Sequence, residues 1–351
     1  MNNIIKYDLA FIFILFLLMA GCKLQKRELS NSNNKDLNAI DLKGNWKFSI
    51  GDDTSWSDKN YDDKNWEEIK VPSRWEDQGF NGYDGYAWYR VHFKYDRAMK
   101  NNYIYLNLGR VDDVDQTFLN GHLIGLMGSF PPNFQTAYYV VRRYYLPSEF
   151  LDSAADNVIA VRVYDYQLSG GILEGDPGLE FTDKNHSLNL ILSGIWKFKT
   201  GDDPLYAKTD YDDSKWKAIT VPSFWELQGY RDYDGYGWYR KKFKVPGNLT
   251  EKDLMLYLGK IDDIDQTYLN GILIGSTGNF SKEPPEFNKH NEYLRVRTYN
   301  IPSGILKSSG ENILAVRVYD GMKDGGIYEG PVGIIEKDRY TAFWRSLNSE
   351  K

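Results

Sequence analysis

The sequence contains one long segment twice, and this repeat constrains the fold more than any other feature. Residues 42–125 align with residues 192–275 at a constant offset of 150 without a gap, and about half of the aligned positions are identical. After this segment the second copy carries five more residues, so that Asp165 aligns with Asp320. The unit is far longer than the repeats of solenoids and propellers, so each copy is predicted to be a complete domain.

The two copies also set the predicted organisation of the chain. The first domain is expected over residues 42–181 and the second over residues 192–335. Residues 182–191 would form the linker between them, and residues 336–351 a C-terminal tail.

Strand patterns dominate both copies. Residues 103–108 are rich in β-forming types, and residues 158–164 read as a strand with one buried face. Asn120 followed by Gly121 is the strongest short signal for a hairpin turn. Since no segment has a long helical period, the predicted fold is all-β, with two tandem jelly-roll β-sandwiches.

Residues 1–22 resemble a bacterial lipoprotein signal peptide. Lys6 precedes the apolar run 9–20, which is short for a membrane span. Cys22 follows two small residues and is the predicted lipidation site, which implies a lipid anchor in the outer membrane, at its periplasmic face or at the cell surface. The alternative is an uncleaved membrane anchor. Residues 23–41 are predicted to be a flexible tether.

Composition excludes several classes of function. The net charge is −6, whereas binding to a phosphate backbone requires clustered Lys and Arg, so no nucleic-acid partner is expected. Cys22 is the only cysteine, which rules out an internal disulfide or a thiolate metal site. The four histidines form no recognisable Ser-His-Asp set, and no nucleophile elbow is present. We therefore expect no catalytic residues in this chain.

Short motifs recur in the same order in both copies. They run from Trp-Lys-Phe through Tyr-Asp-Asp, Val-Pro-Ser, Trp-Tyr-Arg and Leu-Asn-Gly to Ala-Val-Arg-Val. This order resembles the galactose-binding-like jelly roll, the sugar-binding domain of family-two glycoside hydrolases such as β-galactosidase. It is most similar to the accessory jelly roll of sialate O-acetylesterases. The resemblance implies a domain that accompanies a catalytic one, and two jelly rolls leave no stretch for a catalytic domain.

An acidic cluster follows a strand in each copy. Its members are Asp112, Asp113 and Asp115 in the first copy and Asp262, Asp263 and Asp265 in the second. Carboxylates in a loop can hold calcium, so Asp112, Asp113, Asp262 and Asp263 are candidate ligands of a structural calcium ion, and no other cofactor is expected. The alternatives are turn caps, ion pairs with Arg90 and Arg240, or hydrogen bonds to sugar hydroxyls, as the resemblance implies.

Aromatic residues provide the candidate glycan site. Sugar rings stack their C–H faces on Trp and Tyr, and their hydroxyls bond to Asp, Asn and Arg. Segments 75–90 and 225–240 are dense in these types, although both could simply pin the edge of a domain. The candidate ligand-binding residues are Trp75, Tyr83, Asp84, Tyr86, Arg90, Asp112, Asp113, Asp115 and Glu174, with Trp225, Tyr233, Asp234, Tyr236, Arg240, Asp262, Asp263, Asp265 and Glu329 in the second copy.

Three functions are compatible with these features. The first is a non-catalytic, carbohydrate-binding lipoprotein that assists glycan degradation and holds a glycan, or a glycan-degrading enzyme near one. The second is a subunit or diverged member of a glycoside hydrolase or sialate O-acetylesterase family that acts with a separate catalytic chain; as an enzyme it would hydrolyse glycosidic or O-acetyl ester bonds. The third is a scaffold that binds only proteins.

Overall fold

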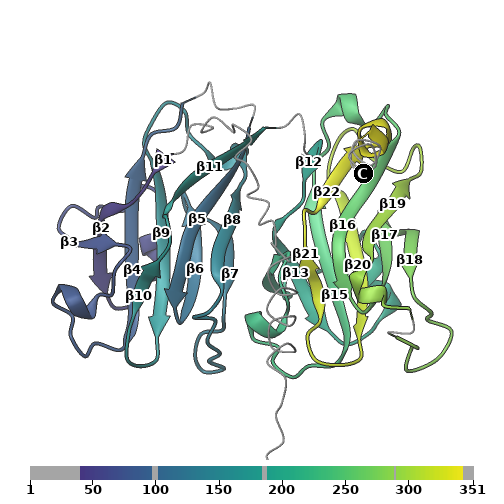
Figure 1. The fold of residues 1–351 in the computed structure, drawn as a ribbon. Coiled ribbons are helices and arrows are strands. Elements are labelled where there is room, and N and C mark those ends of the chain that lie inside the picture. The colour runs from purple at the N-terminus through teal and green to yellow at the C-terminus, as the bar shows by residue number, and fades with distance from the viewer. Residues whose placement is uncertain (1–39, 97–101, 184–187, 288–289, 343–351) are drawn as a thin grey trace, which may run out of the picture. The chain divides into compact units, whose positions relative to one another are not determined.

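The structure of the protein is a computed structural model that describes residues 40–96, 102–183, 188–287 and 290–342 (Figure 1). The described residues form four antiparallel sheets, two from each copy of the repeat. The predicted signal peptide, lipidation site and nearly all of the predicted tether lie outside the described residues.

The first copy folds into a sandwich of a six-stranded and a five-stranded sheet. The six-stranded sheet has the order β3-β2-β4-β9-β6-β7, and the other sheet has the order β1-β11-β5-β10 with β8 also paired to β5. The strands are β1 (Ile40–Asp41), β2 (Gly44–Ile50), β3 (Glu67–Val71), β4 (Gly85–Phe93), β5 (Asn102–Asp112), β6 (Val114–Leu119), β7 (His122–Met127), β8 (Val141–Leu146), β9 (Asn157–Asp165), β10 (Gly171–Glu174) and β11 (Gly178–Asp183). Short 3-10 helices are η1 (Thr54–Ser57), η2 (Glu76–Gln78) and η4 (Ser148–Phe150).

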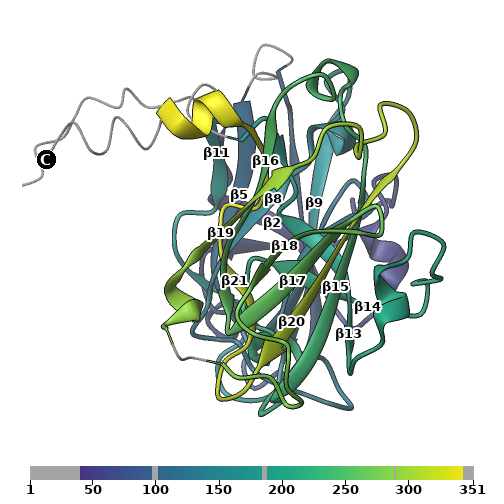
Figure 2. The same ribbon diagram turned by 90° about the vertical axis from the view of Figure 1, so that its right-hand side faces the viewer.

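The second copy repeats this topology strand for strand. Its sheets have the orders β14-β13-β15-β20-β17-β18 and β12-β22-β16-β19, with β21 also paired to β16. The strands are β12 (Leu190–Ile191), β13 (Gly194–Thr200), β14 (Lys217–Val221), β15 (Gly235–Phe243), β16 (Leu254–Asp262), β17 (Ile264–Leu269), β18 (Ile272–Thr277), β19 (Val296–Ile301), β20 (Asn312–Asp320), β21 (Gly326–Glu329) and β22 (Gly333–Glu336). The 3-10 helices are η6 (Pro204–Ala207), η7 (Glu226–Gln228), η8 (Gly247–Leu249) and η9 (Glu292–Leu294), and a short helix covers 337–342. Figure 2 shows β20 between β15 and β17.

Side chains point alternately to the two faces of each strand, and the inward-facing hydrophobic ones form a separate core in each sandwich. Trp46 and Phe48 of β2 point inward and are at most 1% exposed, and Trp196 and Phe198 of β13 do the same. The indole of Trp46 donates a hydrogen bond to the carbonyl of Leu42 at 2.7 Å, so its polar atom is satisfied inside the core. The predicted all-β fold with tandem sandwiches is therefore confirmed.

The Asn-Gly signal marks a tight hairpin in both copies. Asn120 and Gly121 join β6 to β7 with φ angles of 50° and 84°, and Asn270 and Gly271 join β17 to β18 in the same conformation. Asn and Gly tolerate positive φ better than other residues, which explains their place here. Burial differs between the copies at one aligned tryptophan: Trp66 is only half-buried, whereas its counterpart Trp216 is buried.

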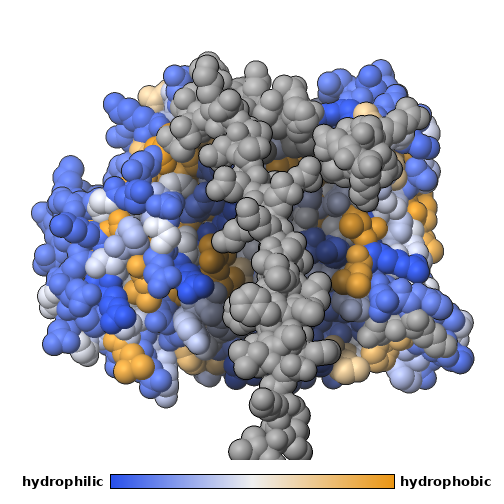
Figure 3. Space-filling view, viewed as in Figure 1, coloured by the Kyte–Doolittle hydropathy of each residue, from blue (hydrophilic) through white to orange (hydrophobic). Residues whose placement is uncertain are grey.

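The surface carries few large apolar areas on the face seen in Figure 3, where hydrophobic residues form small separate patches among hydrophilic ones. In the part of the chain that the structure describes, no helix is long and apolar enough to cross a membrane.

Candidate ligand-binding site

Segment 75–90 lies at the edge of the first sandwich and is held there by internal hydrogen bonds. Trp75 is fully buried, and its indole nitrogen donates to the carbonyl of Tyr83 at 3.1 Å. The hydroxyl of Tyr83 donates in turn to the carbonyl of Tyr86 at 2.6 Å. Asp84 is exposed, and Tyr83 and Tyr86 are half-buried.

The second copy repeats this edge. Trp225 is fully buried, Tyr233 donates to the carbonyl of Tyr236 at 2.8 Å, and Asp234 is exposed. Trp75 and Trp225 therefore belong to the cores. Because they are buried, they are not accessible to a glycan.

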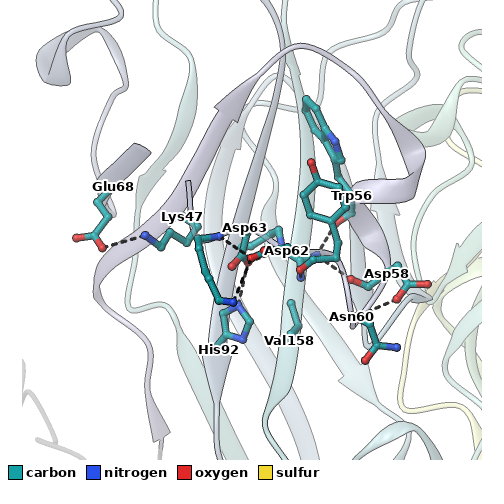
Figure 4. Close-up of polar contacts among 12 residues, drawn as sticks. Lys47, Trp56, Asp58, Asn60, Asp62, Asp63, Glu68, His92 and Val158 are labelled. Carbon is teal, nitrogen blue, oxygen red and sulfur yellow. Dashed lines mark hydrogen bonds and ion pairs between the residues drawn. The ribbon is translucent and has the colours of Figure 1, made fainter. Parts of the chain in front are cut away.

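Arg90 is an internal anchor of the first sandwich and binds Asp63, which Figure 4 shows in contact with His92. Its side chain is fully buried, and its Nε donates to Asp63 Oδ2 at 2.6 Å. Its Nη1 donates to the backbone carbonyls of Trp56 and Asp58 and its Nη2 to that of Tyr61, while His92 also contacts Asp63 at 2.9 Å. All of these partners hold the segment after η1 against β4, so Arg90 is not available to a ligand.

Arg240 plays the same structural part in the second sandwich. Its Nε donates to Asp213 Oδ2 at 2.8 Å, and its Nη1 donates to the backbone carbonyls of Tyr206 and Lys208. Its side chain is fully buried, which removes it from the candidate glycan site as well.

Asp115 belongs to a second buried ion pair, whose partner is not Arg90, the arginine considered among the alternatives for its cluster. Arg142 of β8 donates from Nε to Asp115 Oδ1 at 2.8 Å, and neither side chain is exposed. The hydroxyl of Tyr144 donates to the other carboxylate oxygen at 2.9 Å. The pair ties β8 to β6 across the two sheets.

The second copy contains the same pair, in which Arg297 donates to Asp265 at 3.0 Å. Arg142 and Arg297 escaped prediction because each lies beyond the loop in which the copies differ in length. Aligned after that loop, VRRYY and VRTYN provide a weak signal for them.

Asp112 and Asp113 do approach each other, and a third carboxylate joins them. Asp112 ends β5, Asp113 precedes β6 and Asp165 ends β9, and one carboxylate oxygen from each lies within 4.8 Å of the others. Burial, together with the neighbouring charge of Asp113, raises the pKa of Asp112 to about 7. Burial also raises the pKa of Asp165 to about 7. We refer to Asp112, Asp113 and Asp165 as the first acidic cluster.

The second acidic cluster consists of Asp262, Asp263 and Asp320, which meet the same 4.8 Å condition. Burial and the proximity of Asp263 raise the pKa of Asp262 to about 8, and burial raises the pKa of Asp320 to about 7. Asp165 and Asp320 were not among the predicted site residues, although they end the matched strands NVIAVRVYD and NILAVRVYD. That recurrence was the signal available for them.

Asp113 connects the first acidic cluster to the surface. Its Oδ1 accepts a hydrogen bond from the Thr136 hydroxyl, and its Oδ2 accepts one from the backbone N–H of Tyr166 at 3.0 Å. Its carbonyl accepts from the N–H of Ala137 at 3.1 Å. Asp113 therefore holds both the loop 128–137 and the turn that follows β9.

This loop and turn bring together a group of aromatic side chains on the first sandwich. Tyr86 and Phe130 stack with centroids 5.8 Å apart and an interplanar angle of 4°, and Phe134 stacks on Tyr166 at 5.1 Å. Tyr166 is 57% exposed. We name Tyr86, Phe130, Phe134, Tyr164 and Tyr166 the aromatic platform.

Arg162 packs against two rings of the platform, those of Phe130 and Tyr86. Its guanidinium lies 4.3 Å from the Phe130 centroid and 4.8 Å from that of Tyr86, and its Nε donates to Asp52 Oδ1 at 2.7 Å. Of this group only Tyr86 was predicted from the sequence, because Phe130 and Phe134 lie in the loop where the two copies diverge.

The second sandwich has a reduced version of this surface. Arg317 lies over Tyr236 and Phe280, and Phe287 approaches Tyr319 at 6.0 Å. The position that corresponds to Tyr166 is Gly321, so no ring is available there for stacking. In addition, Tyr236 donates to Glu283 at 2.8 Å.

Glu174 and Glu329 form exposed ion pairs rather than contacts with the acidic clusters. Glu174 lies 3.5 Å from Arg110, and Glu329 lies 2.9 Å from Lys260. Each pair joins a short strand to its neighbour in the five-stranded sheet.

Together these features define a class of protein: tandem antiparallel β-sandwiches, each built around buried Arg–Asp pairs and carrying an acidic cluster beside a surface of aromatic side chains. Residues 51–168 and 204–324 match the family described as the β-galactosidase second all-beta domain. These segments make up more than half of the chain, which therefore belongs to this family.

Individual relatives are glycan-processing enzymes. A β-galactosidase of Photobacterium profundum is 30% identical over 173 residues, covering 40% of this chain and 15% of that enzyme. A β-glucuronidase of Streptococcus agalactiae is 30% identical over 113 residues, covering 30% of this chain and 18% of that enzyme. Among solved structures, a Bacteroides uniformis β-glucuronidase matches with a TM-score of 0.37 and 16% sequence identity. The match covers 81% of this chain and 28% of the β-glucuronidase chain. The chain thus spans less than a fifth of the two enzymes matched by sequence.

Proposed function

We propose that this chain is a non-catalytic glycan-binding protein that assists glycan degradation, and that the aromatic platform of the first sandwich is its binding surface. The observation that carries the proposal is the stacking of the half-buried Phe134 on the exposed Tyr166, beside Tyr86 and Phe130. Aromatic faces of this kind suit the apolar faces of sugar rings, and stacking requires little reorganisation of a rigid ring. Membership of a β-galactosidase domain family supports a glycan as the ligand class.

Hydrogen bonds from sugar hydroxyls to the protein would complete recognition of the glycan. The exposed carboxylate of Asp84 is an available acceptor for sugar hydroxyls, and its charge contributes to the raised pKa of Asp165, so it lies near the first acidic cluster. The second sandwich offers fewer aromatic faces, because Gly321 replaces Tyr166. We therefore assign the stronger site to the first sandwich.

A glycan array followed by calorimetry on the purified protein tests this assignment. Tyr166→Ala should weaken binding of any glycan that the array identifies, whereas Leu273→Ala, which truncates an exposed side chain of the second sandwich, should not. Absence of glycan binding at millimolar concentration, or equal affinity of the Tyr166→Ala variant, would refute the platform.

The second candidate is a subunit or diverged member of a glycoside hydrolase or sialate O-acetylesterase family, working with a separate catalytic chain. Its support is the family match and the similarity to β-galactosidases and β-glucuronidases, of which this chain covers only a small part. Stimulation of a co-purified hydrolase would favour it, and activity of the protein alone on nitrophenyl glycosides or acetates would overturn the non-catalytic proposal. A protein scaffold remains as the third candidate, favoured if partners bind and no glycan does.

Calcium binding at the acidic clusters is a proposal separate from glycan binding. Asp112 and Asp113 in the first cluster, and Asp262 and Asp263 in the second, offer the hard oxygen ligands that calcium prefers. We also retain lipidation of Cys22 and attachment to the outer membrane as proposals. Loss of membrane association in a Cys22→Ala variant, judged by cell fractionation, tests them.

A further inference from the structure

Each acidic cluster contains a buried carboxylate oxygen that lacks a hydrogen-bond partner among the described residues. Asp165 is fully buried; its Oδ1 accepts from the N–H of Gln167 at 3.1 Å, while its Oδ2 has no partner. Glu76, close enough to influence the pKa of Asp165, uses Oε1 to accept from Gly170 at 2.9 Å and leaves Oε2 unpartnered and buried. Unpaired buried carboxylate oxygens are costly, so a ligand that satisfies them is expected.

The second sandwich repeats these unpartnered atoms. Asp320 is fully buried, and its Oδ2 likewise has no partner in the described part of the chain. Glu226 is 8% exposed, accepts from Gly325 at 2.9 Å through one oxygen and leaves the other unpartnered. Both copies of the repeat thus leave equivalent carboxylate oxygens unsatisfied beside three equivalent aspartates.

Two arginines act on these carboxylates by their charge, but among the described residues neither makes a hydrogen bond to them. In the first sandwich the Arg142 guanidinium is directed at Asp115 and at three backbone carbonyls, including that of Asp113. In the second sandwich Arg297 makes the matching contacts to Asp265 and to backbone carbonyls. Neither guanidinium donates to the side chains of the clusters.

We propose that a divalent cation of the calcium type binds among Asp112, Asp113 and Asp165 and thereby orders the aromatic platform. Carboxylate oxygens within 4.8 Å of one another can contact one ion, and calcium accepts several protein oxygens in flexible geometry. Magnesium is less suited, because it demands near-ideal octahedral geometry and retains water. That the ordered platform binds a glycan rests on the proposed function; cation binding and its effect on the backbone do not.

Asp113 transmits the effect of the cation to the platform. The same carboxylate that would contact the ion accepts from Thr136 and from the N–H of Tyr166. An ion would fix this carboxylate, and with it the loop that carries Phe134 and the turn that carries Tyr166.

The second sandwich provides an internal comparison. Asp263 accepts from the N–H of Gly321 at 3.1 Å, so the backbone connection is kept without an aromatic ring at that position. A cation there should order the turn after β20 and leave the platform unaffected.

Direct binding to the purified protein tests the site. Titration with calcium by calorimetry, and with terbium by luminescence, should give two ions per chain. The Asp165→Asn and Asp320→Asn variants should each lose one of the two, with affinity at that site reduced roughly tenfold or more. Because each substitution removes one of several like charges, the cation-free variants should unfold at the same or a higher temperature than the parent protein, which separates loss of a ligand from loss of the fold.

Hydrogen exchange followed by mass spectrometry tests the coupling without any glycan. Calcium should slow exchange in peptides that cover 128–140 and 163–170 in the parent protein and in Asp320→Asn, but not in Asp165→Asn. No cation binding at millimolar calcium would overturn the inference. Two bound ions without slower exchange would overturn the coupling. If no glycan binds under any condition while exchange responds to calcium, the proposed function fails and this inference stands.

Discussion

Arg142 and Asp115 form an ion pair whose Nε–Oδ1 distance is 2.8 Å, and neither side chain is exposed to solvent. The pair is repeated by Arg297 and Asp265, so both sandwiches depend on a charged contact between sheets. Removing one member of such a pair leaves an uncompensated buried charge, which is far more costly than the loss of a surface contact.

Arg142→Leu should therefore destabilise the first sandwich by roughly 3–5 kcal/mol. The neighbouring Arg143, whose ion pair with Glu180 is exposed, supplies the control, and Arg143→Leu should change stability by no more than about 1 kcal/mol. Chemical denaturation gives both free energies of unfolding. Equal effects of the two substitutions would show that the buried pair has no special structural part.

Gly170→Ala tests the close packing behind segment 75–90. A Cβ at Gly170 would lie 1.9 Å from Cζ2 of Trp75, and overpacking of a core typically costs about 1–3 kcal/mol. Gly247→Ala is the matched control, since a Cβ there meets no atom within 4 Å. Thermal or chemical unfolding should separate the two variants, and a neutral Gly170→Ala would contradict the packing described here.

Asn120 combines a backbone and a side-chain requirement. Its Nδ2 donates to the carbonyl of Phe150 and to Asn157 Oδ1, and its Oδ1 accepts from the N–H of Val158, each at 2.8 Å. Asn120→Ala should cost roughly 2–4 kcal/mol, because it loses these bonds and strains a residue with φ of 50°.

Asn120→Gly separates the two contributions, since glycine accepts positive φ without strain but forms none of the bonds. Its stability, measured by the same denaturation experiment, should lie between those of the parent protein and Asn120→Ala. A glycine variant as stable as the parent would mean that the side-chain bonds contribute nothing.

Lys241 should make stability depend on alkaline pH. Burial lowers the pKa of its amine to about 8, while the unfolded chain keeps a value near 10.5, so the unfolded state binds more protons between these values. Stability of the parent protein should therefore rise between about pH 8 and pH 10 relative to Lys241→Met, in which this dependence is absent.

The full difference corresponds to roughly 3 kcal/mol. Denaturation of both proteins across this pH range measures it, and parallel curves would indicate that Lys241 titrates as if it were exposed.

Much of the fold could be predicted from the chain alone. The ungapped repeat predicted two equivalent domains, and the Asn120-Gly121 dipeptide predicted the β6–β7 hairpin. Within each copy the signals are local: hydrophobic alternation decides which face of a strand is buried, and a two-residue turn decides its own φ angles.

The candidate site was predicted only in part. Asp112 and Asp113 are adjacent in sequence and were found, whereas Asp165 joins them only because β9 ends where β5 ends. Arg90 and Trp75 belong to sugar-binding residue types, yet both are buried, because residue type does not state which side of a sheet a side chain occupies in the folded domain.

By itself, then, the sequence determined the duplication, the all-β class and the chemical types gathered near each turn. Tertiary structure alone decided which of these side chains meet: it paired Asp115 with Arg142 instead of Arg90, and it placed Phe134 on Tyr166. The physical reason is that these contacts join strands and loops far apart in the chain. Their geometry follows from the order of strands in the sheets and from the packing between sheets, which no local pattern encodes.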